Sequence, residues 1–135
     1  MPAPVGWQVT GVVVPGMQRG RLLGYPTANV DLTAGAVTPP DGVYAGVVTV
    51  IERAGIRYRA AISVGTNPTF AEGGRTVEAY LLDFDGDLYG CAVQVHAVRR
   101  LRGTIRFPDA EALVAAMETD VRATRAAILD AVLVD

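Results

Sequence analysis

The residues of this chain best suited to chemistry lie between positions 16 and 29. Glycine lets a backbone approach a ligand closely and reach positive φ, and successive amides in such a loop form a concave anion site. Arginine adds a fixed positive charge whose planar fork suits phosphate. The segment could therefore hold a polyphosphate through three glycines and two arginines: Gly16, Gly20, Gly24, Arg19 and Arg21.

Three further residues follow in the same segment. Pro26 fixes the φ angle of a turn that presents the hydroxyl of Thr27 and the amide of Asn29. Their oxygens could contact the metal ion that accompanies a polyphosphate. From the residues alone two other interpretations stay open: a glycine-rich connection between strands, and a Thr/Asn turn that caps its own backbone.

Composition excludes several classes of protein. All basic residues are arginine, so neither a Walker A loop nor a protein-kinase β3 strand, which both need a lysine, is present. A net charge of −2 argues against binding nucleic acid by bulk electrostatics. Cys91 is the sole cysteine, so an intrachain disulfide is impossible, and a reduced cytoplasm fits. The sequence shows neither a signal peptide nor an apolar stretch of membrane-spanning length.

The elements that must position these residues are mostly strands. Alternation of apolar and polar residues predicts strands over five segments: 7–14, 43–52, 56–64, 76–84 and 91–101. The connector 53–55 predicts a hairpin, and Asp85-Gly86 is a hairpin turn signal between the last two strands. The triad of aspartates around this turn lacks the glycine and glutamate of a calcium loop, and is expected to be solvated.

The last quarter of the chain has helical periodicity. Apolar residues recur from Leu113 to Val132, which predicts a helix over about 110–132 with Asp109 as its N-cap. Arg122 and Arg125 are expected near the middle of this helix. With one histidine, His96, and one cysteine, a structural zinc site is implausible.

Several motifs occur in a fixed order between residues 9 and 128. The first is Arg19-Gly20-Arg21, followed closely by the tetrapeptide Pro26-Thr-Ala-Asn29. The others are Pro40-Asp-Gly-Val-Tyr-Ala45, Val64-Gly-Thr-Asn-Pro-Thr-Phe70, Val77-Glu-Ala-Tyr-Leu-Leu-Asp-Phe84, Asp87-Leu-Tyr-Gly90 and Leu101-Arg102. This series resembles the riboflavin kinase family, whose signature is the Pro-Thr-Ala-Asn tetrapeptide.

The resemblance implies a fold that pattern alone leaves open between a barrel and a sandwich. It implies a mainly β protein: a six-stranded antiparallel Greek-key barrel with the C-terminal helix packed alongside. Residues 1–135 would form a single kinase-like domain, similar to the C-terminal domain of bacterial bifunctional riboflavin kinase/FAD synthetases. The N-terminal adenylyltransferase domain of those proteins is missing here, so conversion of FMN to FAD is not expected from this polypeptide.

The resemblance also implies an activity and a site: transfer of the γ-phosphoryl of ATP to the 5′-hydroxyl of riboflavin, giving FMN and ADP. Glu78 would be the general base, and Thr27 and Asn29 would bind Mg²⁺. The nucleotide-binding residues would be Gly16, Arg19, Gly20, Arg21, Gly24, Pro26, Thr27 and Asn29. The flavin-binding residues would be Arg102, Thr104, Phe107 and Leu113.

This sequence departs from the family pattern mainly around the expected flavin site. Thr104 stands where glutamate is frequent, Arg106 where lysine is common, Ser63 where asparagine is frequent in bacterial members, and Tyr80 where histidine is common. These departures bear on the flavin contacts more than on phosphoryl transfer. They leave open a second function, a non-catalytic flavin- or nucleotide-binding module on the same barrel.

The expected partners are therefore riboflavin or FMN and ATP or ADP, with neither nucleic acid nor membrane. A third possibility, an oligonucleotide-binding barrel, is disfavoured by the acidic net charge and by the lack of an aromatic and basic stripe. The expected location is the cytoplasm. The sequence does not fix the oligomeric state, although a monomer is compatible with it.

Overall fold

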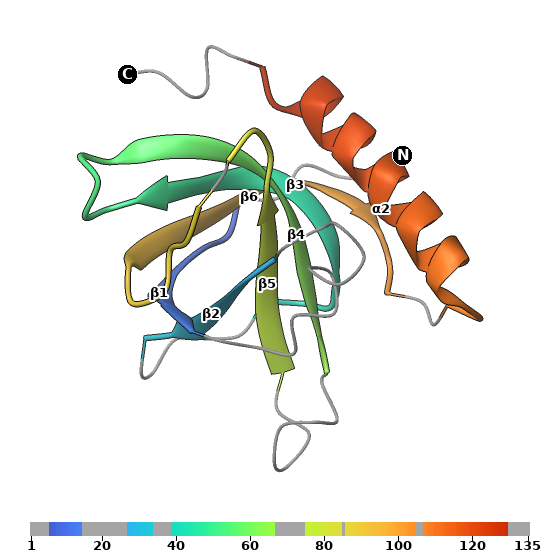
Figure 1. Ribbon diagram of the computed structural model, residues 1–135, viewed down its shortest axis with the longest axis horizontal. Coiled ribbons are helices and arrows are strands. Elements are labelled where there is room, and N and C mark those ends of the chain that lie inside the picture. The colour runs from blue at the N-terminus through green and yellow to red at the C-terminus, as the bar shows by residue number, and fades with distance from the viewer. Residues whose placement is uncertain are drawn as a thin grey trace.

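The computed structural model describes residues 6–14, 27–33, 39–66, 75–84, 86–104 and 107–129. In this part of the chain, six antiparallel strands close into a barrel and one helix lies along its outside (Figure 1). The elements are β1 (Gln8–Val14), β2 (Ala28–Leu32), β3 (Gly42–Val50), β4 (Ile56–Thr66), β5 (Arg75–Leu81), β6 (Ala92–Arg102) and α2 (Ala110–Ala127). The predicted mainly β barrel with a C-terminal helix is confirmed.

The strands follow the order β1-β2-β5-β4-β3-β6 around the closed barrel. Strands β3, β4 and β5 are successive neighbours, and β6 returns to lie beside β3, which is a Greek-key arrangement. The predicted hairpin at 53–55 is confirmed, because β3 and β4 pair on either side of it. The hairpin predicted at Asp85-Gly86 is wrong. Both edges of β5 are already paired, with β2 and with β4, so β6 cannot pair with β5. The chain crosses instead to the edge of β3 that β4 leaves open, where β6 pairs.

The strand β2 was not predicted from the pattern of residues. Asn29 lies inside it and pairs with Val14 of β1 on one side and Glu78 of β5 on the other. A turn that caps its own backbone is therefore the wrong description of Asn29. The neighbouring strands supply the partners for the backbone hydrogen bonds of β2, and the side chain of Val30 points into the barrel core.

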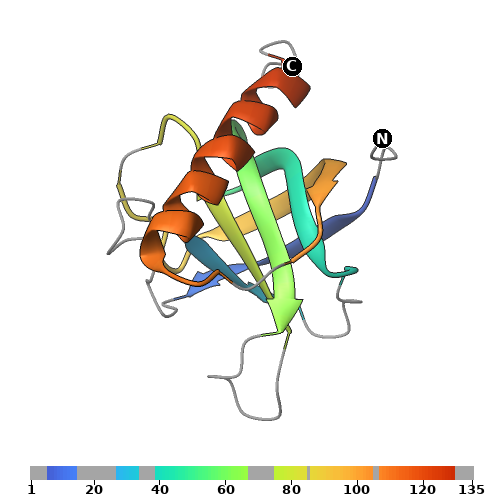
Figure 2. The same cartoon turned by 90° about the vertical axis from the view of Figure 1, so that its right-hand side faces the viewer.

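The barrel interior is filled by side chains that alternate along each strand. Tyr44 and Ile62 are among its largest fully buried residues, and Trp7 packs edge-on against Tyr44 with ring centroids 5.1 Å apart. Strand β3 is buried on both faces. One face lines the interior, while Ala45 and Val47 on the other pack in a second apolar cluster with Ile128, just past α2. The helix therefore covers the outer face of the barrel (Figure 2).

The helix α2 begins where it was predicted to begin and ends earlier. The Asp109 carboxylate accepts a hydrogen bond of 2.8 Å from the Ala112 amide, as an N-cap should. The helix stops at Ala127, not near 132, because Ile128 turns into extended backbone and its carbonyl accepts a 2.7 Å bond from Arg59 Nε. Arg125 consequently lies in the last turn rather than near the middle.

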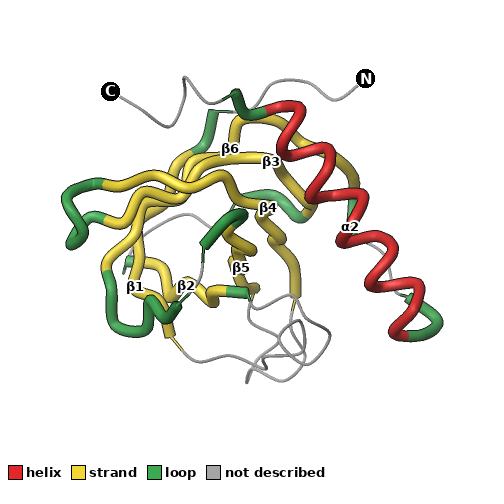
Figure 3. Tube along the Cα trace, turned by 45° about the horizontal axis from the view of Figure 1, so that its top comes forward, coloured by secondary structure: helices red, strands yellow, loops and turns green. Residues whose placement is uncertain are grey.

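Seen as a tube, the helix runs alongside the barrel rather than entering it (Figure 3). Within the described residues, no helix combines the length and apolar character that crossing a bilayer would require.

Candidate functional site

A cavity of about 250 Å³ lies between the outer face of the barrel and α2. The barrel contributes polar side chains to the lining of this cavity, among them Glu78 and Arg102. The helix contributes an apolar wall of Leu113, Met117 and Val121. The apolar stripe that predicted the helix therefore partly faces this cavity rather than only closing the sheet.

Strand register explains how distant parts of the sequence meet here. Directly paired residues of antiparallel strands present their side chains on the same face. Successive pairings link one residue of each of five strands into a single outer row: Asn29, Glu78, Ser63, Val43 and Arg102. Four of these five residues, all except Asn29, line the cavity.

Glu78 is a half-buried carboxylate that lies between Asn29 and Ser63 in this row. Burial raises its pKa above the ordinary value of 4.5, and a hydrogen bond from the Thr27 hydroxyl opposes that rise. The bond from Thr27 Oγ1 to Glu78 Oε1 is long, at 3.4 Å. Within the described chain no arginine pairs with this carboxylate. Its proton affinity is therefore set mainly by loss of water, which is a common state for a general base.

Thr27 and Asn29 approach Glu78 from the same side. Thr27 immediately precedes β2 and lines the cavity, while Asn29 is 5% exposed and lies directly across from Glu78. The Thr27 hydroxyl and the Asn29 amide oxygen are hard oxygen ligands of the kind that Mg²⁺ prefers. The donor set therefore fits a magnesium ion that takes its other ligands from water and phosphate. The described residues hold no cluster of three His, Cys, Asp or Glu side chains.

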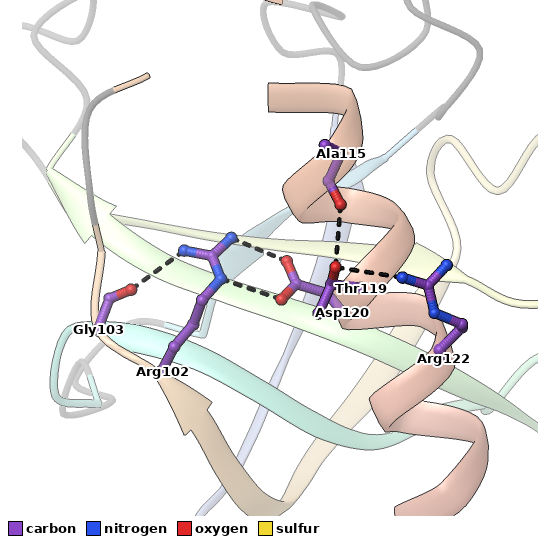
Figure 4. A network of polar contacts seen from close by, with 6 residues as sticks. All are labelled: Arg102, Gly103, Ala115, Thr119, Asp120 and Arg122. Carbon is purple, nitrogen blue, oxygen red and sulfur yellow. Dashed lines mark hydrogen bonds and ion pairs between the residues drawn. The ribbon is translucent and has the colours of Figure 1, made fainter. Parts of the chain in front are cut away.

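The opposite end of the cavity holds an ion pair that sequence reasoning missed. Arg102, at the end of β6, donates from Nε and Nη2 to the two carboxylate oxygens of Asp120 on α2, at 3.0 and 2.8 Å (Figure 4). Its Nη1 donates to the Gly103 carbonyl at 3.1 Å, and its guanidinium lies 5.6 Å from the Phe107 ring centroid. Asp120 lies among the apolar positions of α2. A carboxylate at such a position needs a buried partner, so it was the sequence signal that could have predicted this ion pair.

The remaining predicted site residues divide into two groups. Thr104, Phe107 and Leu113 line the cavity together with Arg102, as do the departures Ser63 and Tyr80. The other predicted nucleotide-binding residues lie outside the described residues: Gly16, Arg19, Gly20, Arg21, Gly24 and Pro26. The cavity thus brings together Thr27, Glu78 and the four predicted flavin-binding residues, while their roles stay predictions.

A family model described as flavokinase, riboflavin kinase, matches residues 3–128. The chain belongs to the riboflavin kinase family. This confirms the resemblance inferred from the ordered motifs.

Individual relatives agree with this assignment. The bifunctional riboflavin kinase/FMN adenylyltransferase of Bacillus subtilis is 35% identical over 115 residues, which cover 83% of this chain and 35% of that protein. The crystal structure of riboflavin kinase from Trypanosoma brucei has a TM-score of 0.64 at 32% identity, covering 88% of this chain and 77% of that one. The chain spans about a third of the length of the bifunctional relatives it matches.

A further crystal structure, described as a macrolide-efflux protein from Streptococcus pneumoniae, has a TM-score of 0.79 at 38% identity. It covers 91% of this chain and 39% of that one. A shared fold carries no activity with it, because function resides in the site.

Proposed function

We propose that this protein transfers the γ-phosphoryl group of ATP to the ribityl 5′-hydroxyl of riboflavin, giving FMN and ADP. The observation that carries the proposal is the desolvated Glu78 carboxylate beside Thr27, at one end of a cavity with an apolar wall. Membership of the riboflavin kinase family supports the substrate.

In this reaction Glu78 accepts the proton of the 5′-hydroxyl while that oxygen bonds to the γ-phosphorus. The bond between the γ-phosphorus and the oxygen that bridges to the β-phosphorus breaks, and ADP leaves with the bonding electrons. Burial raises the pKa of Glu78, which brings its proton affinity closer to that of a useful base near neutral pH. The Thr27 hydroxyl contacts one carboxylate oxygen through its long hydrogen bond, and we assign proton transfer to the other oxygen.

Thr27 and Asn29 are the residues that would hold Mg²⁺, which would neutralise charge on the transferring phosphates when bound. Binding of the polyphosphate by the segment from Gly16 to Pro26 stays a prediction. The flat flavin ring would rest against Phe107, Leu113 and Met117, since ring systems bind in mostly apolar slots. A cytoplasmic location and a single domain over 1–135 also stay predictions.

The test is direct turnover. Purified protein is incubated with riboflavin, ATP and Mg²⁺, and FMN is separated by chromatography. Formation of FMN that needs both ATP and Mg²⁺ is expected. Tight binding of riboflavin or FMN without any turnover would instead support the non-catalytic binding module.

A further inference from the structure

The Arg102 guanidinium is held in one orientation by three hydrogen bonds. Two go to the carboxylate of Asp120 and one to the Gly103 carbonyl. Arginine has five N–H donors in a planar fork, so one N–H on each terminal nitrogen remains without a partner among the described residues. Arg102 also lines the cavity, and its side chain keeps 28% of its surface exposed.

Asp120 is unusual among the carboxylates of α2. Its side chain is 9% exposed, and both of its oxygens are used by Arg102. Such a pair costs much desolvation, and replacing it with apolar residues is often neutral for stability. A stabilising role alone therefore explains the pair poorly. The position of the pair on the cavity wall is explained if Asp120 orients the Arg102 guanidinium toward a ligand.

The two polar ends of the cavity lie apart along the barrel. Glu78 on β5 and Arg102 on β6 are separated by β4 and β3 in the outer row, which spans about 14 Å along the curved sheet. Apolar side chains of α2 cover the interval. A ligand that touches both ends needs a hydroxyl at one end and a planar pair of acceptors at the other.

We propose that Asp120 is a positioning residue that aims the free edge of Arg102 at an adjacent pair of acceptors on the carbonyl edge of the flavin ring, either the C2 carbonyl with N1 or the C4 carbonyl with N5. This rests on the proposed function and adds the orientation of the substrate to it. The carbonyl edge of the ring meets Arg102, the ribityl chain runs toward Glu78, and the dimethylbenzene edge lies against the apolar wall. Planar bidentate donation is the property that distinguishes arginine from lysine at such a place.

The test compares two sets of riboflavin analogues in wild-type protein and in Asp120→Asn and Arg102→Lys. Sulfur accepts hydrogen bonds more weakly than oxygen, so 2-thio- and 4-thioriboflavin weaken the carbonyl edge, whereas 8-chlororiboflavin alters the opposite edge. Wild-type protein should bind at least one thio analogue about tenfold more weakly than riboflavin. Both variants should raise the KM for riboflavin about tenfold, with little change in kcat or in the KM for ATP.

The decisive readout is selectivity. If Arg102 donates hydrogen bonds to the carbonyl edge, both variants should bind the thio analogues and riboflavin about equally well. The substitution in 8-chlororiboflavin should change their flavin binding as much as it changes that of wild type. If Asp120 and Arg102 had a merely structural role, both variants would bind all flavins more weakly by the same factor, and that outcome overturns the proposal. Asp83→Asn is the matched control, because it removes another bidentate ion pair between α2 and the barrel, outside the cavity lining. It should leave every flavin KM unchanged.

Flavin binding, measured by quenching of flavin fluorescence, separates this proposal from the proposed function. Protein that binds riboflavin with the expected selectivity but forms no FMN would refute the kinase reaction and support the role of Asp120. Protein that forms FMN with equal selectivity in wild type and both variants would refute the role of Asp120 alone. Protein that binds no flavin would refute both. Thermal melts of each variant confirm that it is folded.

Discussion

The two ends of the cavity each contain a carboxylate that has lost water, but the two carboxylates have different hydrogen-bond partners. Asp120 is paired through both oxygens with Arg102, whereas Glu78 has only one long hydrogen bond from Thr27. A carboxylate whose two oxygens are both held by a guanidinium is fixed in place and serves as a structural partner. A carboxylate that is desolvated without a cation has a raised proton affinity, so it is the one suited to accept a proton.

The largest expected effect is on turnover at the unpaired end. Glu78→Gln keeps the size of the side chain and an acceptor for Thr27 but removes the basic oxygen. We expect kcat for FMN formation to fall at least about a hundredfold, the low end for loss of a general base. Steady-state assays at saturating riboflavin and ATP measure this. A kcat equal to that of wild type would remove Glu78 from the role.

At the paired end the largest effect should be on stability. Asp120→Ala leaves the partly buried Arg102 guanidinium without its anion, and we expect a loss of about 2–3 kcal/mol in the free energy of unfolding. This is below the range for fully buried pairs, because Arg102 still reaches solvent. Urea denaturation measures it, with the double variant Arg102→Met/Asp120→Leu as the control. That double variant should recover most of the loss, since it leaves no unpaired charge.

At the unpaired end, Glu78 should make stability depend on pH. Burial raises the folded-state pKa of Glu78 above its ordinary 4.5, so the folded state binds this proton more tightly than the unfolded chain does. The contribution of Glu78 to stability is therefore present below about pH 4.5 and is lost as pH rises through the raised pKa. We expect Glu78→Gln to melt at a higher temperature than wild type at pH 7. The difference should shrink toward pH 4.5, and a constant difference would contradict the raised pKa.

The smallest effect is expected where an ion pair is also bidentate but lies in solvent. Asp83 accepts two bonds from Arg125, at 2.8 and 2.9 Å, yet the two side chains are 62% and 48% exposed. Exposed pairs contribute little, because water screens them and ordering the side chains costs entropy. Asp83→Asn should therefore change the urea midpoint far less than Asp120→Ala does. A loss of equal size would show that burial is not what separates the two pairs.

Local patterns predicted the elements whose signal is local. The alternation along 43–52 and 56–64 predicted β3 and β4 and their hairpin, and Asp109 marked the start of α2. The end of the helix was predicted wrongly, since Ile128 leaves the helix to pack on the barrel, a contact that periodicity does not contain. The strand β2 was missed because it is short and its apolar Ala28, Val30 and Leu32 follow a segment dominated by turn residues.

The sequence by itself determined which faces of the strands are apolar, the family through its ordered motifs, and the chemical types gathered at Thr27, Asn29 and Glu78. Only the tertiary structure decided that β5 and β6 do not form a hairpin, and that Asp120 is the partner of Arg102. The physical reason is register. Closing six strands into a barrel sets which residues lie side by side in the outer row, and this pairing depends on the whole sheet rather than on any single segment.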